Sequence, residues 1–336
     1  MHWIALVEGP DHVCCRYRLA AFRPFLERAG FTLDLQTLPR GWWSRLRLFA
    51  RLRGANVIVQ RRLLPRWQFT LLRRAARRLL FDLDDAVFLR DSYSAKRLNP
   101  PGRLRRFAVT VRACDAVVAG NAFLAEQVRD AAPAATVHVI PTCVDPARYS
   151  LAEPERSGPG VQLVWVGSSS TLQGLEKVRP LLEELGRRVP GLRLKLLCDR
   201  FLSFEHLAVE PCRWTEAREA VDLAVADVGI SWIPDDPWSQ GKCGLKVLQY
   251  MAAGLPVVAN PVGVHPEMVR QGETGYLPET PGQWVEAVAR LAADPELRRR
   301  LGRAGRRRVE ADYSVTVGAG RWRALLDGFR RAARPA

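Results

Sequence analysis

The stretch GLKVLQYMAAGLPVVANPVG, residues 244–263, decides the fold. A helix is predicted from about Leu245 to Ala253, because Gly254 is a suitable C-cap and Pro256 cannot continue a helix. The apolar run LPVVANPV follows directly, at 255–262. Strands that are apolar almost throughout are typical of parallel sheets that helices cover on both faces. The stretch therefore predicts one helix–strand unit of an α/β fold.

The same alternation of apolar runs and helical segments extends along the whole chain. Strand-like runs in the first half lie at 2–8, 31–38, 55–60, 78–85, 115–121 and 136–141. Those in the second half lie at 161–167, 192–199, 207–214, 227–234, 255–262 and 274–279. Segments such as 17–29 and 122–130 are predicted to be helices between them. Strands joined by helices imply right-handed crossovers, so the predicted fold class is α/β with two Rossmann-like, doubly wound parallel sheets.

The segment LAEPERSGPG, 151–160, is rich in proline, glycine and charge and has no periodicity, which is typical of a linker. It separates an expected N-terminal domain, 1–150, from an expected C-terminal domain, 161–313. The last predicted helix, within 314–336, is expected to cross back to the first domain. Ligands of such sheets bind beyond the carboxyl ends of the strands, so we expect a cleft between the two halves.

The composition is that of a globular protein, since 48% of the 336 residues are hydrophobic and 26% are charged. No apolar run reaches the roughly 18 residues of a membrane span, and the N-terminal MHWIALVEGP lacks the basic region of a signal peptide. The seven cysteines form no C-x-x-C pair, and the five histidines form no ligand cluster with them. We therefore expect a reduced, cytoplasmic protein without structural zinc.

The net charge of +16 owes much to residues 35–81, which contain twelve arginines and no Asp or Glu. Inside this window, GWWSRLRLFARLR at 41–53 mixes tryptophan, leucine and phenylalanine with arginine. One interpretation is a surface that lies peripherally on an anionic membrane. A second is phosphate contact with nucleic acid, and a third is a solvated arginine-rich face. No DNA- or RNA-binding motif accompanies the charge, so nucleic acid is the least favoured partner.

Two of the five lysines, Lys242 and Lys246, lie four residues apart at the start of the helix predicted near 245–253. A helix N-terminus carries about half a positive charge, so cations there are unfavourable unless an anion binds. Gly241 and Gly244 allow the backbone to approach a ligand closely. We expect a phosphate at this position, and the alternative is that both lysines project into water.

A second loop suited to anions follows the run 161–167 and leads into a helix. Its residues are Gly167, Ser168, Ser169, Ser170 and Thr171. A serine or threonine at such a place is also a common N-cap, which is the alternative role. The pattern is neither a P-loop nor the dinucleotide fingerprint G-x-G-x-x-G.

Five segments together resemble a known family. They are VVAGNAFLAEQV (117–128), VIPTCVDPARY (139–149), VWVGSSS (164–170), ADVGISWIP (226–234) and GLKVLQYMAAGLPVVANPVGVHPEMV (244–269). The chain resembles the retaining GT-B glycosyltransferases of family 4, the group of sucrose synthases and mannosyltransferases, over nearly its whole length. The resemblance implies a GT-B fold, a nucleotide diphosphate sugar as donor and no metal cofactor.

In that family, the segment that here ends at Glu267 closes over the donor, which implies that Glu267 binds it. Two acidic residues of the family, which contact the sugar and the ribose, fall on Gly241 and Gln249. The amide of Gln249 retains the capacity to bind ribose hydroxyls, whereas Gly241 offers backbone contacts alone.

The family's diphosphate-binding G-R…K is replaced by Gly167-Ser168 without a matching lysine. We therefore hypothesise that Lys242 and Lys246 supply the missing charge, together with the hydroxyl and backbone donors of residues 168–171.

The densest carboxylate group of the chain is FDLDDAVF, 81–88, at the end of a predicted strand. Asp82-x-Asp84-Asp85 is similar to the metal-binding D-x-D of the GT-A class. Two similar halves argue against that class, and in GT-B relatives this strand end faces the acceptor. Asp84 or Asp85 is therefore the candidate to orient or deprotonate an acceptor hydroxyl. The alternative is a helix N-cap or a carboxylate paired with arginine.

Three further residues are acceptor-side candidates. Arg16 and Tyr17 lie in HVCCRYRL (12–19), and Asn121 begins the helix predicted at 122–130. His12, in the same loop as Arg16, is a candidate base. Surface exposure and helix packing are the alternative roles for Arg16 and Tyr17.

The predicted function is transfer of a hexose from a nucleotide diphosphate sugar to an acceptor hydroxyl, with retention of configuration. The basic first half favours an acceptor that is lipid-linked, at a membrane surface or otherwise anionic, and a saccharide is the other candidate acceptor. Two alternatives remain: a sugar-nucleotide epimerase of the same fold, and a degenerate sugar-nucleotide-binding protein whose basic surface binds membrane or nucleic acid. Turnover of a donor separates the binding protein from the enzymes.

Overall fold

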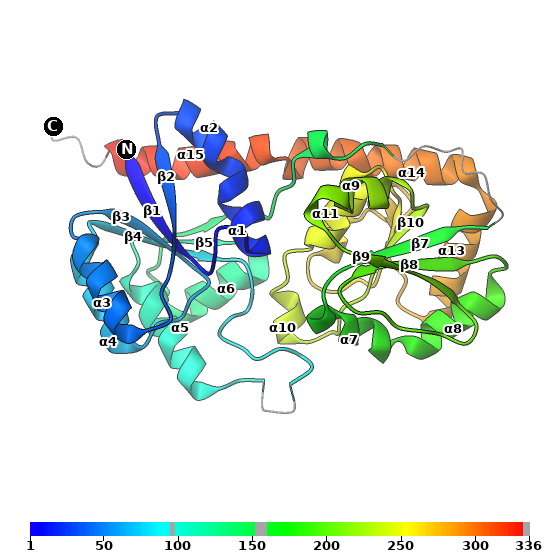
Figure 1. Cartoon of the computed structure of the whole chain (residues 1–336), viewed down its shortest axis with the longest axis horizontal. Helices are drawn as coiled ribbons and strands as arrows, with labels where there is room; N and C mark the ends of the chain where they lie inside the picture. Colours follow the sequence, from blue (N-terminus) through cyan, green and yellow to red (C-terminus); the bar gives the residue numbers. More distant parts are fainter. Residues whose placement is uncertain (95–97, 152–159, 332–336) are drawn as a thin grey trace. The chain divides into compact units, whose positions relative to one another are not determined.

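The computed structural model describes residues 1–94, 98–151 and 160–331 (Figure 1). The chain divides into two compact units. Unit 1 comprises Met1–Cys143, Asp236–Cys243 and Val315–Ala336, and unit 2 comprises Val144–Asp235 and Gly244–Ser314. Each unit is built on a six-stranded sheet whose strand pairs are all parallel, so the predicted α/β class with two Rossmann-like sheets is confirmed.

The sheet of unit 1 has the strand order β2-β1-β3-β4-β5-β6. Its strands are β1 His2–Val7, β2 Thr32–Thr37, β3 Asn56–Gln60, β4 Arg78–Leu83, β5 Ala116–Ala119 and β6 Val137–Val139. The helices are α1 Val13–Arg18, α2 Arg23–Arg28, α3 Trp42–Arg51, α4 Arg66–Ala75, α5 Pro101–Ala113, α6 Ala122–Ala131, α10 Pro237–Gln240 and α15 Val315–Arg331. The order reverses between β1 and β3, which is where ligands of such sheets bind.

Helices cover both faces of this sheet, which explains its apolar strands. All five residues of β3 are buried. Val57 and Val59 join the core under α3, α4 and α5, whereas Ile58 joins the core under α1, α2 and α15 (Figure 1). Alternate side chains of a strand point to opposite faces, so a strand between two helical layers is apolar at consecutive positions.

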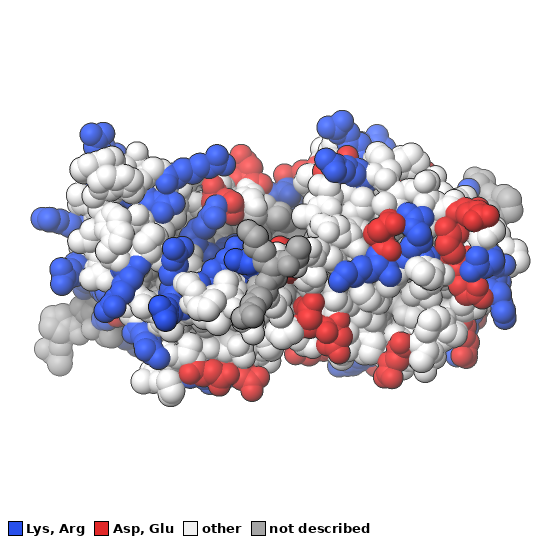
Figure 2. All heavy atoms as spheres, turned by 90° about the horizontal axis from the view of Figure 1, so that it is seen from below, with Lys and Arg blue, Asp and Glu red and all other residues white. Residues whose placement is uncertain are grey.

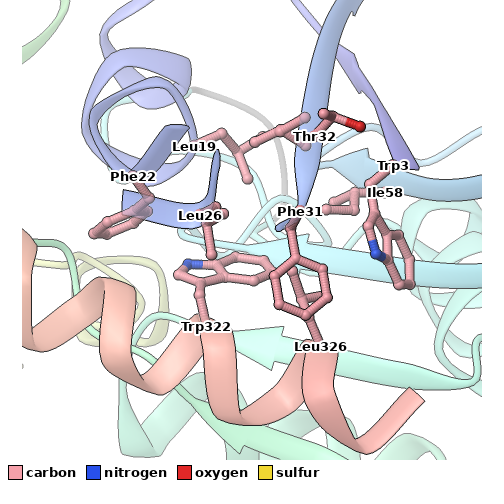
Figure 3. A pocket seen from close by; sticks show the side chains of 10 residues that line it. Trp3, Leu19, Phe22, Leu26, Phe31, Thr32, Ile58, Trp322 and Leu326 are labelled. Carbon is pink, nitrogen blue, oxygen red and sulfur yellow. The ribbon is translucent and has the colours of Figure 1, made fainter. Parts of the chain in front are cut away.

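Helix α15 completes the core of unit 1. Figure 3 shows Trp322 and Leu326 of α15 beside Phe31, Leu26 and Phe22. Trp322 is 1% exposed. The C-terminal helix therefore belongs to the same packed unit as the first strand.

Unit 2 has the strand order β12-β11-β10-β7-β8-β9, which reverses between β7 and β10. Its strands are β7 Gln162–Val166, β8 Arg193–Cys198, β9 Ala208–Arg213, β10 Val228–Ser231, β11 Val257–Ala259 and β12 Gly275–Tyr276. The helices are α7 Ser169–Lys177, α8 Arg179–Arg188, α9 Glu216–Ala224, α11 Leu245–Ala252, α12 His265–Met268, α13 Pro281–Ala293 and α14 Pro295–Arg308.

The limits of the units differ from the predicted domain limits. Unit 2 begins at Val144 rather than near 161, because Val144 N–H donates to the Tyr313 carbonyl at 3.0 Å and Arg306 donates to the Tyr149 carbonyl at 2.9 Å. Residues 236–243 belong to unit 1 although they were predicted within the second domain. Most of the predicted linker, residues 152–159, lies outside the described residues.

The segment predicted as one helix at 17–29 is interrupted. Helix α1 ends at Arg18, a short 3₁₀ turn spans Ala20–Phe22, and α2 begins at Arg23. Pro24 lies in the first turn of α2, where its missing N–H costs nothing, so it favours a new helix start over a continuous helix.

Candidate functional site

The carboxyl end of the unit 1 sheet holds a buried ion pair between Arg18 of α1 and Asp82 of β4. The two side chains are 1% and 0% exposed. Arg18 Nη2 donates to Asp82 Oδ1 at 2.5 Å, and Gln60 Nε2 donates to Asp82 Oδ2 at 3.1 Å. Burial alone would lower the pKa of Arg18, but the charge of Asp82 raises it above its ordinary value. The guanidinium therefore stays charged although it is buried.

Asp84 and Asp85 follow β4 and share the guanidinium of Arg61. Arg61 Nη2 lies 3.0 Å from Asp85 Oδ2, and Arg61 Nε lies 3.4 Å from Asp84 Oδ1. Lys242 Nζ donates to both carboxylate oxygens of Asp85, at 3.0 and 3.1 Å. Arg61 has a φ of 47°, a conformation that costs free energy in a residue other than glycine. Sequence reasoning missed Arg61, although its place directly after β3 is where functional side chains gather.

Asn121 anchors the segment that carries Lys242. Its Nδ2 donates to the carbonyls of Gln240 and Lys242, at 3.0 Å each. Its Oδ1 accepts from Leu124 N–H at 2.8 Å and so caps α6. These three bonds give Asn121 a structural role that the sequence did not reveal. Its contact with an acceptor stays a prediction.

Gly241 packs against Ala86 without room for a side chain. An added Cβ would lie 2.6 Å from Ala86 Cβ and 2.9 Å from Ala86 N. A glutamate, the residue of the resembled family at this position, would displace Ala86. Beside it, Lys242 Nζ lies 3.4 Å from the centroid of the Trp238 ring. Lys242 therefore contacts a carboxylate and an aromatic face, both within unit 1.

The candidates in α1 have structural contacts. His12 Nδ1 accepts from Cys14 N–H at 3.3 Å and caps the helix. The Arg16 guanidinium lies 5.7 Å from the ring centroid of Tyr17, a side chain that is 7% exposed. The predicted acceptor contacts of Arg16 and Tyr17 stay predictions.

In unit 2, the loop after β7 forms the cap of α7. Ser168 and Thr171 form a reciprocal capping box, in which Ser168 N–H donates to Thr171 Oγ1 at 3.2 Å. The hydroxyl oxygens of Ser168 and Ser170 lie 2.8 Å apart, and both residues are exposed. An added Cβ at Gly167 would collide with the Trp165 ring and Thr171. The N-cap alternative therefore holds for Ser168, and the exposed hydroxyls are the groups that a ligand can reach.

A carboxylate already occupies the N-terminus of α7. Ser169 N–H donates to Asp199 Oδ1 at 2.6 Å. Hydrogen bonds from Ser169 lower the pKa of Asp199 to about 2. A phosphate at this helix end would meet the charge of Asp199. Sequence reasoning missed this residue, and its position directly after β8 is the signal that marks it.

Helix α11 carries Lys246 and Gln249. The Lys246 ammonium lies 3.8 Å from the centroid of the Trp165 ring, and Gln249 is 3% exposed. Glu267, in the first turn of α12, is exposed. Lys246 belongs to unit 2 and Lys242 to unit 1, so the two predicted phosphate ligands have different surroundings.

His265 joins the ends of β10 and β11 and was not among the predicted site residues. Its Nδ1 lies 2.8 Å from the Asn260 carbonyl oxygen, and its Nε2 lies 3.1 Å from Ser231 Oγ. A carbonyl can only accept, so Nδ1 carries the proton and Nε2 accepts from the serine hydroxyl. Burial lowers the pKa of His265 to about 4, and the charge of Lys246 adds to this effect. The imidazole is therefore neutral at pH 7.

Within residues 1–94, 98–151 and 160–331, no group of three or more His, Cys, Asp or Glu side chains is arranged to hold a metal ion. Metal independence stays a prediction.

Residues 237–308, from α10 to the end of α14, match the family Glycosyl transferases group 1. Sucrose-phosphate synthase from Thermosynechococcus elongatus has a similar structure, with a TM-score of 0.80 and 18% identity over 99% of each chain. The chain has the GT-B fold. The predicted resemblance to GT-B glycosyltransferases is thereby confirmed.

Two further proteins are similar to this chain. The structure of HepE from Anabaena in complex with UDP and glucose has a TM-score of 0.69 and 14% identity, covering 98% of this chain and 100% of that chain. D-inositol 3-phosphate glycosyltransferase of Segniliparus rotundus is 30% identical over 199 residues, which are 53% of this chain and 41% of that protein. The chain thus spans less than half the length of this curated relative.

Proposed function

We propose that the protein transfers a hexosyl group from a nucleotide diphosphate sugar to an acceptor hydroxyl, with retention and without a metal ion. The observation that carries this proposal is the match of residues 237–308 to Glycosyl transferases group 1 in a chain with the GT-B fold. HepE was solved with UDP and glucose, so UDP-glucose is the first donor to test. The acceptor is a hydroxyl of a saccharide or a lipid-linked compound.

The donor role is assigned to the carboxyl end of the unit 2 sheet. Negative charge develops on the diphosphate as its bond to the sugar breaks, and fixed donors and cations stabilise that charge. Lys246 is the basic residue of α11, and the exposed hydroxyls of Ser168 and Ser170 are additional donors. Asp199 opposes an anion at the start of α7, which supports Lys246 as the main compensating charge. Gln249 is the candidate for the ribose hydroxyls.

The acceptor role is assigned to Asp85 in unit 1. Arg61 and Lys242 both contact its carboxylate, which would fix its orientation toward an acceptor O–H. In the transfer step, the bond between sugar C1 and the diphosphate breaks while the acceptor oxygen bonds to C1. The acceptor proton passes to the departing diphosphate on the same face, so configuration is retained without a protein nucleophile.

The test is a screen of UDP-, GDP-, ADP- and dTDP-sugars, with and without EDTA, by thermal shift and by release of the nucleotide. A ligand at 100 times its Kd raises the free energy of unfolding by about 2.7 kcal/mol, which is visible in such a screen. Stabilisation by one nucleotide together with acceptor-dependent release supports the proposal. Stabilisation without release would favour a sugar-nucleotide-binding protein, and conversion of the sugar without an acceptor would favour an epimerase. Lack of stabilisation by every nucleotide would contradict all three.

A further inference from the structure

Helices α3 and α4 of unit 1 bring three exposed tryptophans together. Trp42 and Trp43 begin α3 and are 45% and 65% exposed, and Trp67 in the first turn of α4 is 48% exposed. In the part of the chain that the structure describes, no other tryptophan is classed as exposed. The rings of Trp42 and Trp43 stack at 3.7 Å between centroids, and Trp67 meets Trp42 edge-on at 6.2 Å. A contiguous exposed cluster of large apolar rings marks an interaction site.

The same two helices carry exposed arginines. We call the Trp–Arg surface the set formed by Trp42, Trp43, Trp67, Arg47, Arg51 and Arg66, all of which are exposed. Figure 2 shows unit 1, on the left, from the side on which α3, α4 and α5 lie in Figure 1, and Lys and Arg dominate there. Asp and Glu are visible there at the lower edge, whereas the unit 2 side of the same view mixes both signs of charge.

The charge of this region is poorly compensated. Residues 35–81 contain twelve arginines and no Asp or Glu. The carboxylates that reach this region come from outside the window, such as Glu8 at 2.6 Å from Arg62 and Asp115 at 2.7 Å from Arg73. Burial lowers the pKa of Arg45, and the charge of nearby Arg62 adds to this effect. A negatively charged partner would relieve this crowding of like charges.

The arginines of α14 in unit 2 provide a contrast. Arg299 pairs with Glu296, Arg306 with Glu310 and Arg308 with Asp312, each within three or four residues. Glu296 lies in α14, and Glu310 and Asp312 lie in the turn Val309–Tyr313 that follows it, so this arginine-rich segment carries its own counter-charges. The Trp–Arg surface combines exposed aromatic rings with charge that its own helices do not balance.

We propose that the Trp–Arg surface binds unit 1 to an anionic lipid bilayer. Tryptophan prefers the membrane interface, where its ring contacts acyl chains and its N–H stays near the head groups. Arginines near an anionic surface each strengthen binding about fivefold. Helices with this pattern lie in the plane of the interface. Among the described residues, no helix has the length and apolar character needed to cross a bilayer.

Single-stranded nucleic acid is the competing partner, since basic surfaces with aromatic rings also bind it. Such binding needs free ring faces on which successive bases stack. Here Trp42 and Trp43 stack on each other, which occupies one face of each ring. Insertion into a bilayer needs no free face, because the whole cluster is buried together. The observed stacking therefore favours the bilayer.

The test uses the full chain and vesicles of phosphatidylcholine, with and without phosphatidylglycerol, in a sedimentation assay. One variant carries Arg47→Gln, Arg51→Gln and Arg66→Gln, and a second carries Trp42→Ser, Trp43→Ser and Trp67→Ser. The matched control, Arg300→Gln/Arg303→Gln/Arg307→Gln, removes the same charge from exposed positions of α14. Thermal unfolding of each variant checks the fold, which exposed substitutions leave intact.

The wild type is expected to bind anionic vesicles, and the α3–α4 arginine variant to bind about a hundredfold more weakly. The tryptophan variant should bind anionic vesicles about tenfold more weakly than the wild type. Raising the salt from about 0.1 to 1 M should release the wild type from these vesicles. The α14 control should bind within about threefold of the wild type. No binding to anionic vesicles, or equal losses in the α14 control and the α3–α4 variant, would overturn the proposal. The proposal would also be overturned if the wild type bound a single-stranded oligonucleotide but no vesicles, and if the α3–α4 variants lost that oligonucleotide binding. The proposal stands or falls independently of glycosyl transfer, because no step of this assay involves a nucleotide sugar.

Discussion

The carboxyl ends of the two sheets share a parallel architecture and differ in their chemistry. In unit 1, three carboxylates are held by three cations: Asp82, Asp84 and Asp85 with Arg18, Arg61 and Lys242. In unit 2, the strand ends are joined by neutral groups, since Ser231 and the Asn260 carbonyl hold a neutral His265. Lys246 lies nearby against an aromatic ring, and Ser168 and Ser170 expose their hydroxyls.

This difference supports a division of roles. At the carboxyl end of the unit 1 sheet the carboxylates are already paired with cations, so a further anion would be bound only weakly there. The oriented carboxylates suit a neutral hydroxyl. The carboxyl end of the unit 2 sheet offers hydroxyls, amides and Lys246 at the start of α11, which suit a diphosphate and a ribose, although Asp199 opposes an anion at the start of α7. The following predictions are ordered from the largest expected effect to the smallest, and each can break or sharpen this division.

Loss of Arg18 tests whether unit 1 depends on compensated charge. Arg18→Met leaves Asp82 buried without its cation, so the free energy of unfolding should fall by about 3–5 kcal/mol. Urea denaturation measures the loss. The control is Arg18→Met/Asp82→Leu, which should recover most of it because packed apolar groups can replace a buried ion pair. A loss below about 1 kcal/mol in the single variant would show that the pair is not needed.

Acid should weaken unit 2 through His265. Its pKa of about 4 in the folded protein lies below about 6.5, the value of an unfolded chain. The unfolded state therefore binds the proton first. The contribution of His265 to the free energy of unfolding is complete above about pH 6.5 and is lost as the pH falls toward 4, by up to about 3 kcal/mol.

His265→Gln should remove this part of the pH dependence between pH 4 and 6.5. Denaturation curves measured between pH 4 and 6.5 give the slope of the free energy of unfolding against pH for wild type and variant. If wild type and variant have the same slope, the imidazole is not the group that titrates.

Gly241 tests how closely the segment 236–243 is packed against unit 1. Gly241→Ala should lower the free energy of unfolding by about 1–3 kcal/mol, because its Cβ would collide with Ala86. Gly9→Ala is the control, since nothing lies within 4 Å of its added Cβ. Ala86→Gly in the Gly241→Ala background should relieve the loss. An unchanged midpoint of denaturation in Gly241→Ala would mean that Gly241 and Ala86 are not closely packed.

Asp199 tests whether the start of α7 is open to phosphate. Asp199→Asn removes the anion that binds Ser169 N–H, so the affinity for a nucleoside diphosphate should rise about two- to fivefold. Titration calorimetry with UDP measures the change. Glu205→Gln removes the same charge from an exposed neighbouring position and should have no effect. A fall in affinity would indicate that Asp199 positions the donor instead of opposing it.

The sequence predicted both sheets because strands between helical layers are apolar at consecutive positions, as at 57–59. It also predicted the carboxylates after β4 and the lysine on α11, since chain order alone places them at strand ends or a helix start. It could not predict the partners of Lys242. They depend on bonds from Asn121 and on the packing of Gly241 against Ala86, which join segments more than a hundred residues apart.

Arg61 and Asp199 show a second limit. Each directly follows a strand, as a functional side chain would, but many polar residues do so. Only the structure distinguishes these two residues. Arg61 has a positive φ and contacts two carboxylates, and Asp199 accepts a hydrogen bond from the N–H of Ser169. Sequence position selects candidates, whereas tertiary contacts decide among them.

The most direct test of the division is nucleotide binding by Lys246→Ala and Lys242→Ala, measured separately with the nucleotide that stabilises the wild type. Lys246→Ala should weaken binding at least about tenfold, because a hydrogen bond to a charged group is lost. Lys242→Ala should bind the nucleotide within about twofold of the wild type and lose sugar transfer, since Asp85 loses one of its two cations. Equal loss of binding in both variants would mean that the two lysines form one phosphate clamp, and the division of roles between the units would be wrong.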